Sequence, residues 1–228
     1  MTFKTDIETS GFSLIDTQIS QSELRDTVLA YRRFIEEFSL VDKLNTHRLI
    51  NQNQNLQVGF IGKKSEFGYD DTGNFHFNKT LETQNFFPNN KTYQNLIERL
   101  SKLYKQTQTI TIDLISKLEK DNLLDSEKLL NSDGTPTLIL KILDYNTQSK
   151  TKLSEIVKQH SNQSVLSFVH YETDSDSELQ HSNKIKVFPG MQWNKASECR
   201  VPQLYNDGIP NFKKSLIVVD LGLKIRYL

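Results

Sequence analysis

Two stretches of the chain carry apolar residues at helical spacing. In the first, Ser20 and Glu23 have the spacing of a capping box, which predicts a helix that starts after Ser20. Its apolar stripe consists of Leu24, Val28, Tyr31, Ile35 and Phe38. The second stretch predicts a long helix over roughly 92–121, with a stripe of Leu96, Leu100, Leu103, Thr107, Ile110, Leu114 and Leu118. A helix of this length is expected to pack along most of its length.

The later part of the chain changes to runs rich in β-branched, aliphatic and aromatic residues. These runs predict strands over 137–143, 164–171, 185–188 and 215–221, and earlier strands are expected over 12–16 and 75–77. The polar range 45–55 predicts a loop, and Gly59, Gly62, Gly68 and Gly73 predict turns with short strands between them. Because helices come first and strands follow, the order predicts an α+β protein with a mostly antiparallel sheet or barrel.

Length and composition narrow the class of protein. A chain of 228 residues with 36% hydrophobic residues can bury a sizeable core. We expect one domain over 1–228, with a mainly helical part over 1–130 and a β core over 131–228. Lys and Arg (28) balance Asp and Glu (28), so the net charge of zero argues against nucleic-acid binding by bulk charge.

The sequence also predicts a cytoplasmic location without a membrane partner. No stretch is long and apolar enough for a transmembrane helix, and the polar, acidic N-terminal segment lacks the features of a secretory signal. With a single cysteine, Cys199, the chain has no disulfide framework. A lone cysteine of this kind is most often a small buried apolar residue.

Two local pairs have the spacing of metal ligands. They are His160-Ser-Asn162 and His170-Tyr-Glu172, and in each pair alternation would place both side chains on one side of a strand. Such pairs are common by chance and are more often ordinary histidines than ligands. Whether the side shared by His170 and Glu172 is the interior of a barrel or its outer face stays open. The sequence contains neither a phosphate-binding glycine loop nor an HExxH or CxxC motif.

Several motifs follow one another in a recognisable order. The first are Gly11-Phe12, then Phe38-Ser-Leu40 with Lys43, then Gly68-Tyr69 before the strand over 75–77, and then Leu140-Lys-Ile-Leu-Asp-Tyr145 after the long helix. Next come His160-Ser-Asn162, the strand Val165–Val169, the acidic Asp174–Asp176 and Glu178-Leu-Gln180. The last are Lys195-Ala-Ser-Glu-Cys199-Arg-Val201 and Lys213-Lys-Ser-Leu216. In this order and spacing they resemble the isopenicillin N synthase-like branch of the non-haem Fe(II)/2-oxoglutarate oxygenases.

The resemblance implies a double-stranded β-helix, or jelly-roll, core and an iron site of two histidines and one carboxylate. His160 matches the first histidine, and Asn162 stands at the carboxylate position. Cys199 stands at the distal histidine position, or Gln203 does if the alignment shifts. Glu172 is an alternative oxygen ligand. The implied cofactors are Fe(II) and 2-oxoglutarate.

The same resemblance places a carboxylate-binding group near the end of the chain. Lys213 stands where the family has the arginine that grips the carboxylate of 2-oxoglutarate or of substrate, and Ser215 and Tyr145 complete the group. Lysine keeps the charge but lacks the bidentate fork of arginine. The interval from His160 to Cys199 is shorter than is usual in the family, which predicts a jelly roll trimmed by strands or loops.

These departures leave three functions to weigh. Asn162 offers a neutral amide to a divalent iron, and a thiolate at Cys199 would be prone to oxidation beside dioxygen. The first reading is therefore a degenerate member that binds a small molecule or a protein without catalysis. The second is an active Fe(II)-dependent dioxygenase or oxidase with a non-standard ligand set. The third discards the resemblance and takes the chain as an unrelated α+β interaction or effector protein.

Overall fold

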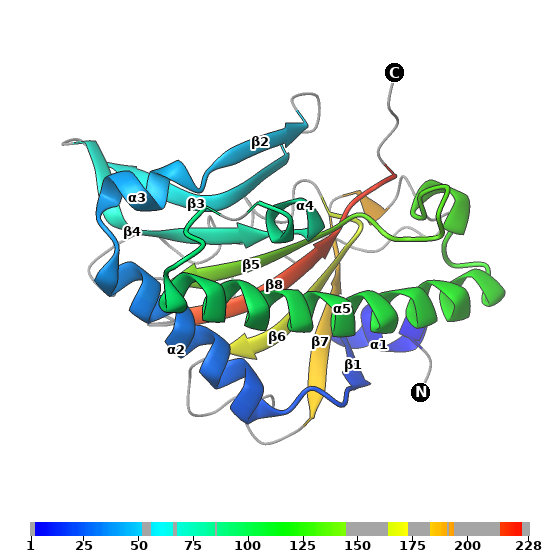
Figure 1. Ribbon diagram of the computed structural model, residues 1–228. Coiled ribbons are helices and arrows are strands. Elements are labelled where there is room, and N and C mark those ends of the chain that lie inside the picture. Colours follow the sequence, from blue (N-terminus) through cyan, green and yellow to red (C-terminus); the bar gives the residue numbers. More distant parts are fainter. Residues whose placement is uncertain are drawn as a thin grey trace.

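The computed structural model describes residues 3–51, 56–65, 68–84, 86–144, 164–172, 183–190, 192–193 and 215–224. The described strands form one eight-stranded antiparallel sheet in the order β1-β7-β6-β8-β5-β4-β3-β2 (Figure 1). Their bounds are β1 Ser13–Asp16, β2 Arg48–Asn51, β3 Leu56–Ser65, β4 Gly68–Phe77, β5 Leu138–Asp144, β6 Leu166–Glu172, β7 Lys184–Pro189 and β8 Ser215–Leu221. The last strand, β8, lies between β5 and β6, so the middle of the sheet is assembled from segments far apart in sequence.

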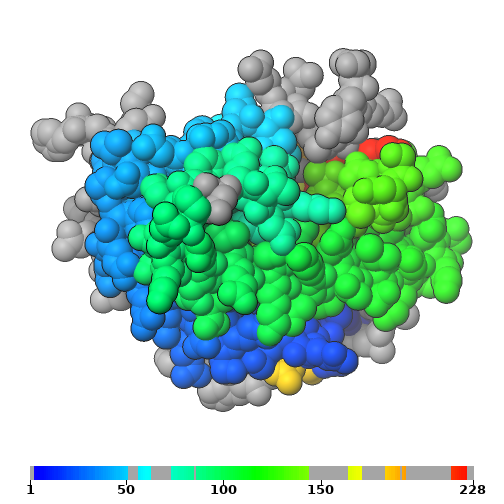
Figure 2. Space-filling view, in the orientation of Figure 1, coloured from blue at the N-terminus to red at the C-terminus, as the bar shows by residue number. Residues whose placement is uncertain are grey.

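The helices lie on one side of this sheet. Their bounds are α1 Phe3–Ser10, α2 Gln21–Glu37, α3 Leu40–Asn45, α4 Lys79–Glu82 and α5 Lys91–Lys120, with a short 3₁₀ helix at Ser126–Lys128. In Figure 1, α2 and α5 lie in front of the strands, and the side chains of α5 form a continuous band across this side of the molecule in Figure 2. None of the described helices is long and apolar enough to cross a membrane.

Helix α2 confirms the predicted start and most of the predicted stripe. The side chain of Ser20 accepts a hydrogen bond from the backbone N–H of Glu23 at 3.2 Å, which caps the first turn. Leu24, Val28 and Tyr31 are buried as expected, and Phe34 joins them. The helix ends before Phe38, whose ring packs against Phe34 at 4.8 Å between centroids.

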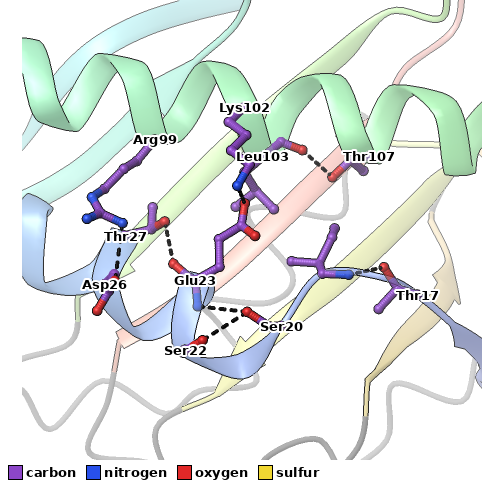
Figure 3. Close-up of polar contacts among 11 residues, drawn as sticks. Thr17, Ser20, Ser22, Glu23, Asp26, Thr27, Arg99, Lys102, Leu103 and Thr107 are labelled. Carbon is purple, nitrogen blue, oxygen red and sulfur yellow. Dashed lines mark hydrogen bonds and ion pairs between the residues drawn. The ribbon is translucent and has the colours of Figure 1, made fainter.

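Helices α2 and α5 meet through an apolar core edged by ion pairs. In Figure 3, Lys102 points towards Glu23 and Arg99 towards Asp26. The Lys102–Glu23 pair measures 3.2 Å and the Arg99–Asp26 pair 3.4 Å. Each pair has one partner that is at least half open to solvent, Lys102 or Asp26. Such pairs contribute little, typically below about 1 kcal/mol, so the buried apolar side chains hold the two helices together. Because Glu23 pairs with Lys102, its side chain points towards α5.

The structure differs from the sequence prediction in the segment around β2 to β4. The range 45–55 is not wholly a loop, because Arg48–Asn51 forms β2. The glycines that the sequence predicts at turns lie inside two ten-residue strands, β3 and β4, that pair as one long hairpin. Gly59 explains one such position: its φ is +88°, and a Cβ there would lie 2.0 Å from the carbonyl oxygen of Thr46. Three short helices, α1, α3 and α4, were also not predicted.

Candidate functional site: the second face of the sheet

The two faces of the sheet have different surroundings. One face packs under the helices and buries side chains such as Phe75, Leu140, Phe168 and Val219 in the main core. We call the other the second face; it carries a separate small apolar cluster centred on Leu143, Val169 and Val218, with Leu14 and Phe188 packed beside it. No residue of a described helix belongs to that cluster.

Polar side chains stand beside this cluster. Lys141 on β5 is directly opposite Val218 on β8 and His76 on β4, and residues directly opposite in an antiparallel pair share a face. Asp220 on β8 is directly opposite Ser167 on β6. Lys141, His76, Asp220 and Ser167 therefore all belong to the second face.

Three of these residues form one hydrogen-bond network. Lys141 Nζ donates to Asp220 Oδ2, and Ser167 Oγ donates to Asp220 Oδ1 at 2.6 Å. The Oγ atoms of Ser164 and Ser167 are 3.0 Å apart, and because the proton of Ser167 goes to Asp220, Ser164 is the donor in this contact. The side chains of Lys141 and Asp220 are only 12% and 9% exposed. Each oxygen of the Asp220 carboxylate thus accepts one hydrogen bond, and the Lys141 ammonium compensates its charge.

Sequence reasoning missed this network. Lys141 and Asp220 each interrupt an otherwise apolar strand, in Leu138-Ile-Leu-Lys-Ile-Leu143 and in Leu216-Ile-Val-Val-Asp-Leu221. The signal that could have found them is the charge itself. A charged residue inside a buried strand is rarely unpaired, and here the two interruptions have opposite signs.

His170 lies on the other side of the sheet, against α5. Its Nε2 is 3.0 Å from Thr107 Oγ1, and its side chain is fully buried. Because the Thr107 hydroxyl donates to the carbonyl of Leu103 at 2.9 Å, His170 Nε2–H is the donor to Thr107. Its Nδ1 then remains a buried acceptor with no partner among the described residues. Burial lowers the pKa of His170 from 6.5 to about 3, so the ring is neutral.

The backbone at His170 also breaks the pattern expected from sequence. The pairing of β6 with β8 shifts between Val169 and Tyr171, which leaves His170 as the extra residue of a β-bulge. The simple alternation that grouped His170 with Glu172 is therefore interrupted. The question left open by the sequence is settled for His170: it faces the helix-covered side, under α5.

Most residues that the resemblance assigned to the site lie outside the described residues. These are His160, Asn162, Cys199, Gln203, Lys213 and Tyr145. Ser215 and Glu172 lie within strands, but their side chains are outside the described part. Their backbones pair with Asp144 and Leu216, respectively, so both belong to the end of the sheet where β8 begins. The predicted metal ligands and the predicted carboxylate-binding group therefore stay predictions.

A hollow lies on the helical side of the sheet, between α4 and α5. This open pocket of about 750 Å³ is lined by Glu82, Ser101, Lys102 and Lys105 among others. The Ser101 hydroxyl donates to Glu82 at 2.6 Å and Lys105 does so at 2.9 Å, and these contacts, Ser101 foremost, lower the pKa of Glu82. The polar groups of this pocket are therefore paired with one another, as are those of the second face.

Comparison with solved structures identifies the architecture. The chain matches a protein from Shewanella oneidensis that is described as an oxygenase, with a TM-score of 0.60 and 13% identity, covering 97% of this chain and 85% of that one. It matches a C-terminally truncated protein of Neurospora crassa, solved in its apo form, with a TM-score of 0.57 and 12% identity, over 96% and 85% of the two chains. A protein from Caulobacter crescentus, assigned to the 2OG-Fe(II) oxygenase family, gives 0.54 and 10%, over 97% and 80%.

The chain has the fold of these oxygenases. The predicted α+β architecture, with a jelly-roll core and a long helix packed on the sheet, is confirmed. At this identity the likeness concerns the fold alone, because one fold supports many functions. No family model matches the chain, and no curated protein does.

The oxygenase fold implies Fe(II) and 2-oxoglutarate, and the described residues can be tested for their fit to both. None of the described His, Cys, Asp and Glu side chains come together in a group of three or more that could hold a metal ion. Asp220, the buried carboxylate of the second face, is held by Lys141 and Ser167. Lys141, which could attract a dicarboxylate, already carries that counter-charge. The described part of the second face fits neither group.

Proposed function

We propose that the chain is a degenerate member of the oxygenase family that works by binding a small molecule or a protein, not by iron catalysis. One observation carries the proposal. At the position that the resemblance gives to the carboxylate ligand, the sequence has Asn162, whose amide is neutral. A divalent iron held by two histidines and one carboxylate depends on that negative charge.

Two further observations support this proposal. Cys199, or Gln203, stands where the distal histidine is expected, and Lys213 replaces the arginine of the carboxylate-binding group. Within the described residues, two buried side chains of ligand type are engaged elsewhere. His170 bonds to Thr107 under α5, and Asp220 bonds to Lys141 and Ser167.

The alternative is an active Fe(II)-dependent oxidoreductase with a rewritten ligand set. His160 is retained, and Asn162 or Glu172 could supply oxygen while Cys199 or Gln203 supplies the remaining ligand. The shared fold supports both proposals equally. The fold also agrees with the sequence resemblance. The third reading, an unrelated interaction protein, discards that resemblance and is therefore disfavoured.

Restoring the family ligands tests the degenerate reading. We expect the double variant Asn162→Asp/Cys199→His to bind Fe(II) at least about tenfold more tightly than the unmodified chain, because it completes two histidines and one carboxylate. Asn162→Asp/Gln203→His tests the shifted alignment. In each case His160→Ala, added as a third substitution, should abolish the gain. If neither double variant gains affinity, the positions taken from the resemblance are wrong.

A further inference from the structure

The hollow between α4 and α5 contains an anion and a cation in fixed contact. Its volume of about 750 Å³ lies within the range of small-molecule sites. Glu82 belongs to the last turn of α4 and Lys105 to the middle of α5, and their charged groups are 2.9 Å apart. Ser101, which is buried, donates to the same carboxylate at 2.6 Å. A ligand would therefore meet a charge pair whose position is already set.

Each member of this pair has hydrogen-bonding capacity to spare. Both contacts of Glu82 end on Oε1, so no group among the described residues donates to Oε2. Lys105 donates to Glu82 alone within the same part of the chain, and an ammonium has three N–H donors. The side chains of Glu82 and Lys105 are 32% and 63% exposed. A ligand can therefore reach both without breaking the ion pair.

The charges around the hollow balance. Its described lining contains two carboxylates, Glu82 and Glu98, and two ammonium groups, Lys102 and Lys105. The hydrogen bond from Ser101 and the contact with Lys105 lower the pKa of Glu82, so its carboxylate stays charged at neutral pH. A ligand with a single charge would meet groups of its own sign as well as the opposite one. A ligand that carries both charges can pair with each.

The hollow also has an apolar wall. Ile97 lies one helical turn before Ser101 on α5, lines the hollow and packs against the main core. Figure 3 shows the other lysine of the lining, Lys102, turned towards Glu23 on α2. Lys105 is therefore the cation that faces Glu82, and an apolar group held at this pair can lie against Ile97.

We propose that the hollow between α4 and α5 binds a free α-amino acid with an apolar side chain. Its ammonium group lies on Glu82 Oε2, its carboxylate on Lys105 Nζ and its side chain against Ile97. The two charges of an α-amino acid are on adjacent carbon atoms, which suits protein groups of opposite sign that touch. This inference goes beyond the proposed function and uses none of the residues on which that proposal rests, so either can fail without the other.

Three probes with one apolar body test the need for both charges. Leucine carries both, 4-methylpentanoate lacks the ammonium group, and 3-methylbutylamine lacks the carboxylate. In titrations of the full chain followed by ¹H–¹⁵N NMR, we expect leucine to bind about fivefold more tightly than either of the others. This is the factor for one partly exposed ion pair in good geometry. The backbone amide signals of α5 around Ser101 and Lys105 should shift.

Two variants should change the affinities in opposite patterns. Glu82→Gln should weaken leucine and 3-methylbutylamine by about threefold or more and leave 4-methylpentanoate no weaker, because it removes only the partner of the ammonium group. Lys105→Met should weaken leucine and 4-methylpentanoate and leave 3-methylbutylamine no weaker. Lys117→Met, exposed and further along α5, is the matched control and should change none of the three. The ratios in the unmodified protein need no variant, so they decide even if a variant does not fold.

Three results overturn the inference: a single-charge probe bound as tightly as leucine, shifts confined to amides outside α4 and α5, or no leucine bound up to about 10 mM. Fe(II) affinity, measured on the same preparation, tests the proposed function separately. Tight iron binding with the preference for leucine intact would contradict the proposed function alone. A protein with neither iron affinity nor this preference would contradict this inference alone.

Discussion

At the scale of single residues, His170, one of the two histidines with metal-ligand spacing, has another role. His170 shares its spacing with a carboxylate in sequence, yet its ring is buried under α5 and bonded to Thr107. Spacing alone could not show this, because Thr107 is 63 positions away and the bulge at His170 is not visible in the order of residues. Buried polar groups of this kind stabilise a fold only when their partners are present.

Thr107→Val should therefore destabilise the protein by about 1–3 kcal/mol, since it leaves His170 Nε2–H buried without an acceptor. The matched control is Thr109→Val on the same helix, because Thr109 is exposed and its hydroxyl also bonds to the preceding turn, at Lys105. That control should change the free energy of unfolding by less than about 0.5 kcal/mol. Urea unfolding of both variants measures the difference, and equal losses would refute the assigned role of Thr107.

The pH dependence of stability follows from the same ring. Burial lowers the pKa of His170 to about 3, whereas in the unfolded chain it returns to about 6.5. Between these values the unfolded state binds a proton that the folded state does not. His170 therefore contributes a loss of stability as the pH falls below about 6.5, at about 1.4 kcal/mol per pH unit.

Urea unfolding from about pH 7 to about pH 4.5 isolates this contribution when the protein is compared with His170→Gln. The variant should show a shallower fall in the free energy of unfolding by that amount per pH unit, whatever its stability at neutral pH. Parallel curves for the two proteins would mean that His170 does not remain neutral in the fold.

At the scale of elements, the sequence predicted the helices with long periodic stripes and the strands with apolar runs. Helices α2 and α5 and strands β5 to β8 all follow their sequence patterns within a residue or two. The prediction failed at β2 and at α1, α3 and α4. These elements are too short to show a clear period, so their formation depends on what they contact. It also failed at the β3–β4 hairpin, where glycines serve close packing inside strands rather than turns. The Lys141–Asp220 pair joins positions 79 residues apart, beyond any local pattern.

The junction of α3 with β3 gives a test at this scale. Gly59 and Gly134 both have positive φ, at +88° and +76°, but only Gly59 is crowded, by the backbone of Thr46 and His47. Gly134→Ala should cost about 1–2 kcal/mol from its backbone conformation alone. Gly59→Ala should cost at least about 2 kcal/mol more, because the junction must move to admit a methyl group. Urea unfolding measures both, and equal costs would show that the junction yields freely.

At the scale of the whole molecule, the fold is that of the solved oxygenases, whereas the residues at the expected site differ from those of the family. The sheet, its helical cover and the likeness to solved oxygenases agree with the architecture expected from the motif order. At the positions that the sequence resemblance assigns to the iron ligands and to the carboxylate-binding arginine, the chain has Asn162, Cys199 and Lys213. On the second face, a charge-compensated network and an apolar cluster occupy the described strands. Our proposal that the chain works by binding rests on this difference between its fold and its residues.

The most direct test is an anaerobic titration of the purified, unmodified protein with Fe(II), with and without 2-oxoglutarate. We expect no stoichiometric binding up to about millimolar Fe(II), a range in which a complete set of two histidines and one carboxylate would be filled. One equivalent of iron bound at about micromolar affinity or better, and lost in His160→Ala, would contradict it and establish an enzyme with a rewritten ligand set.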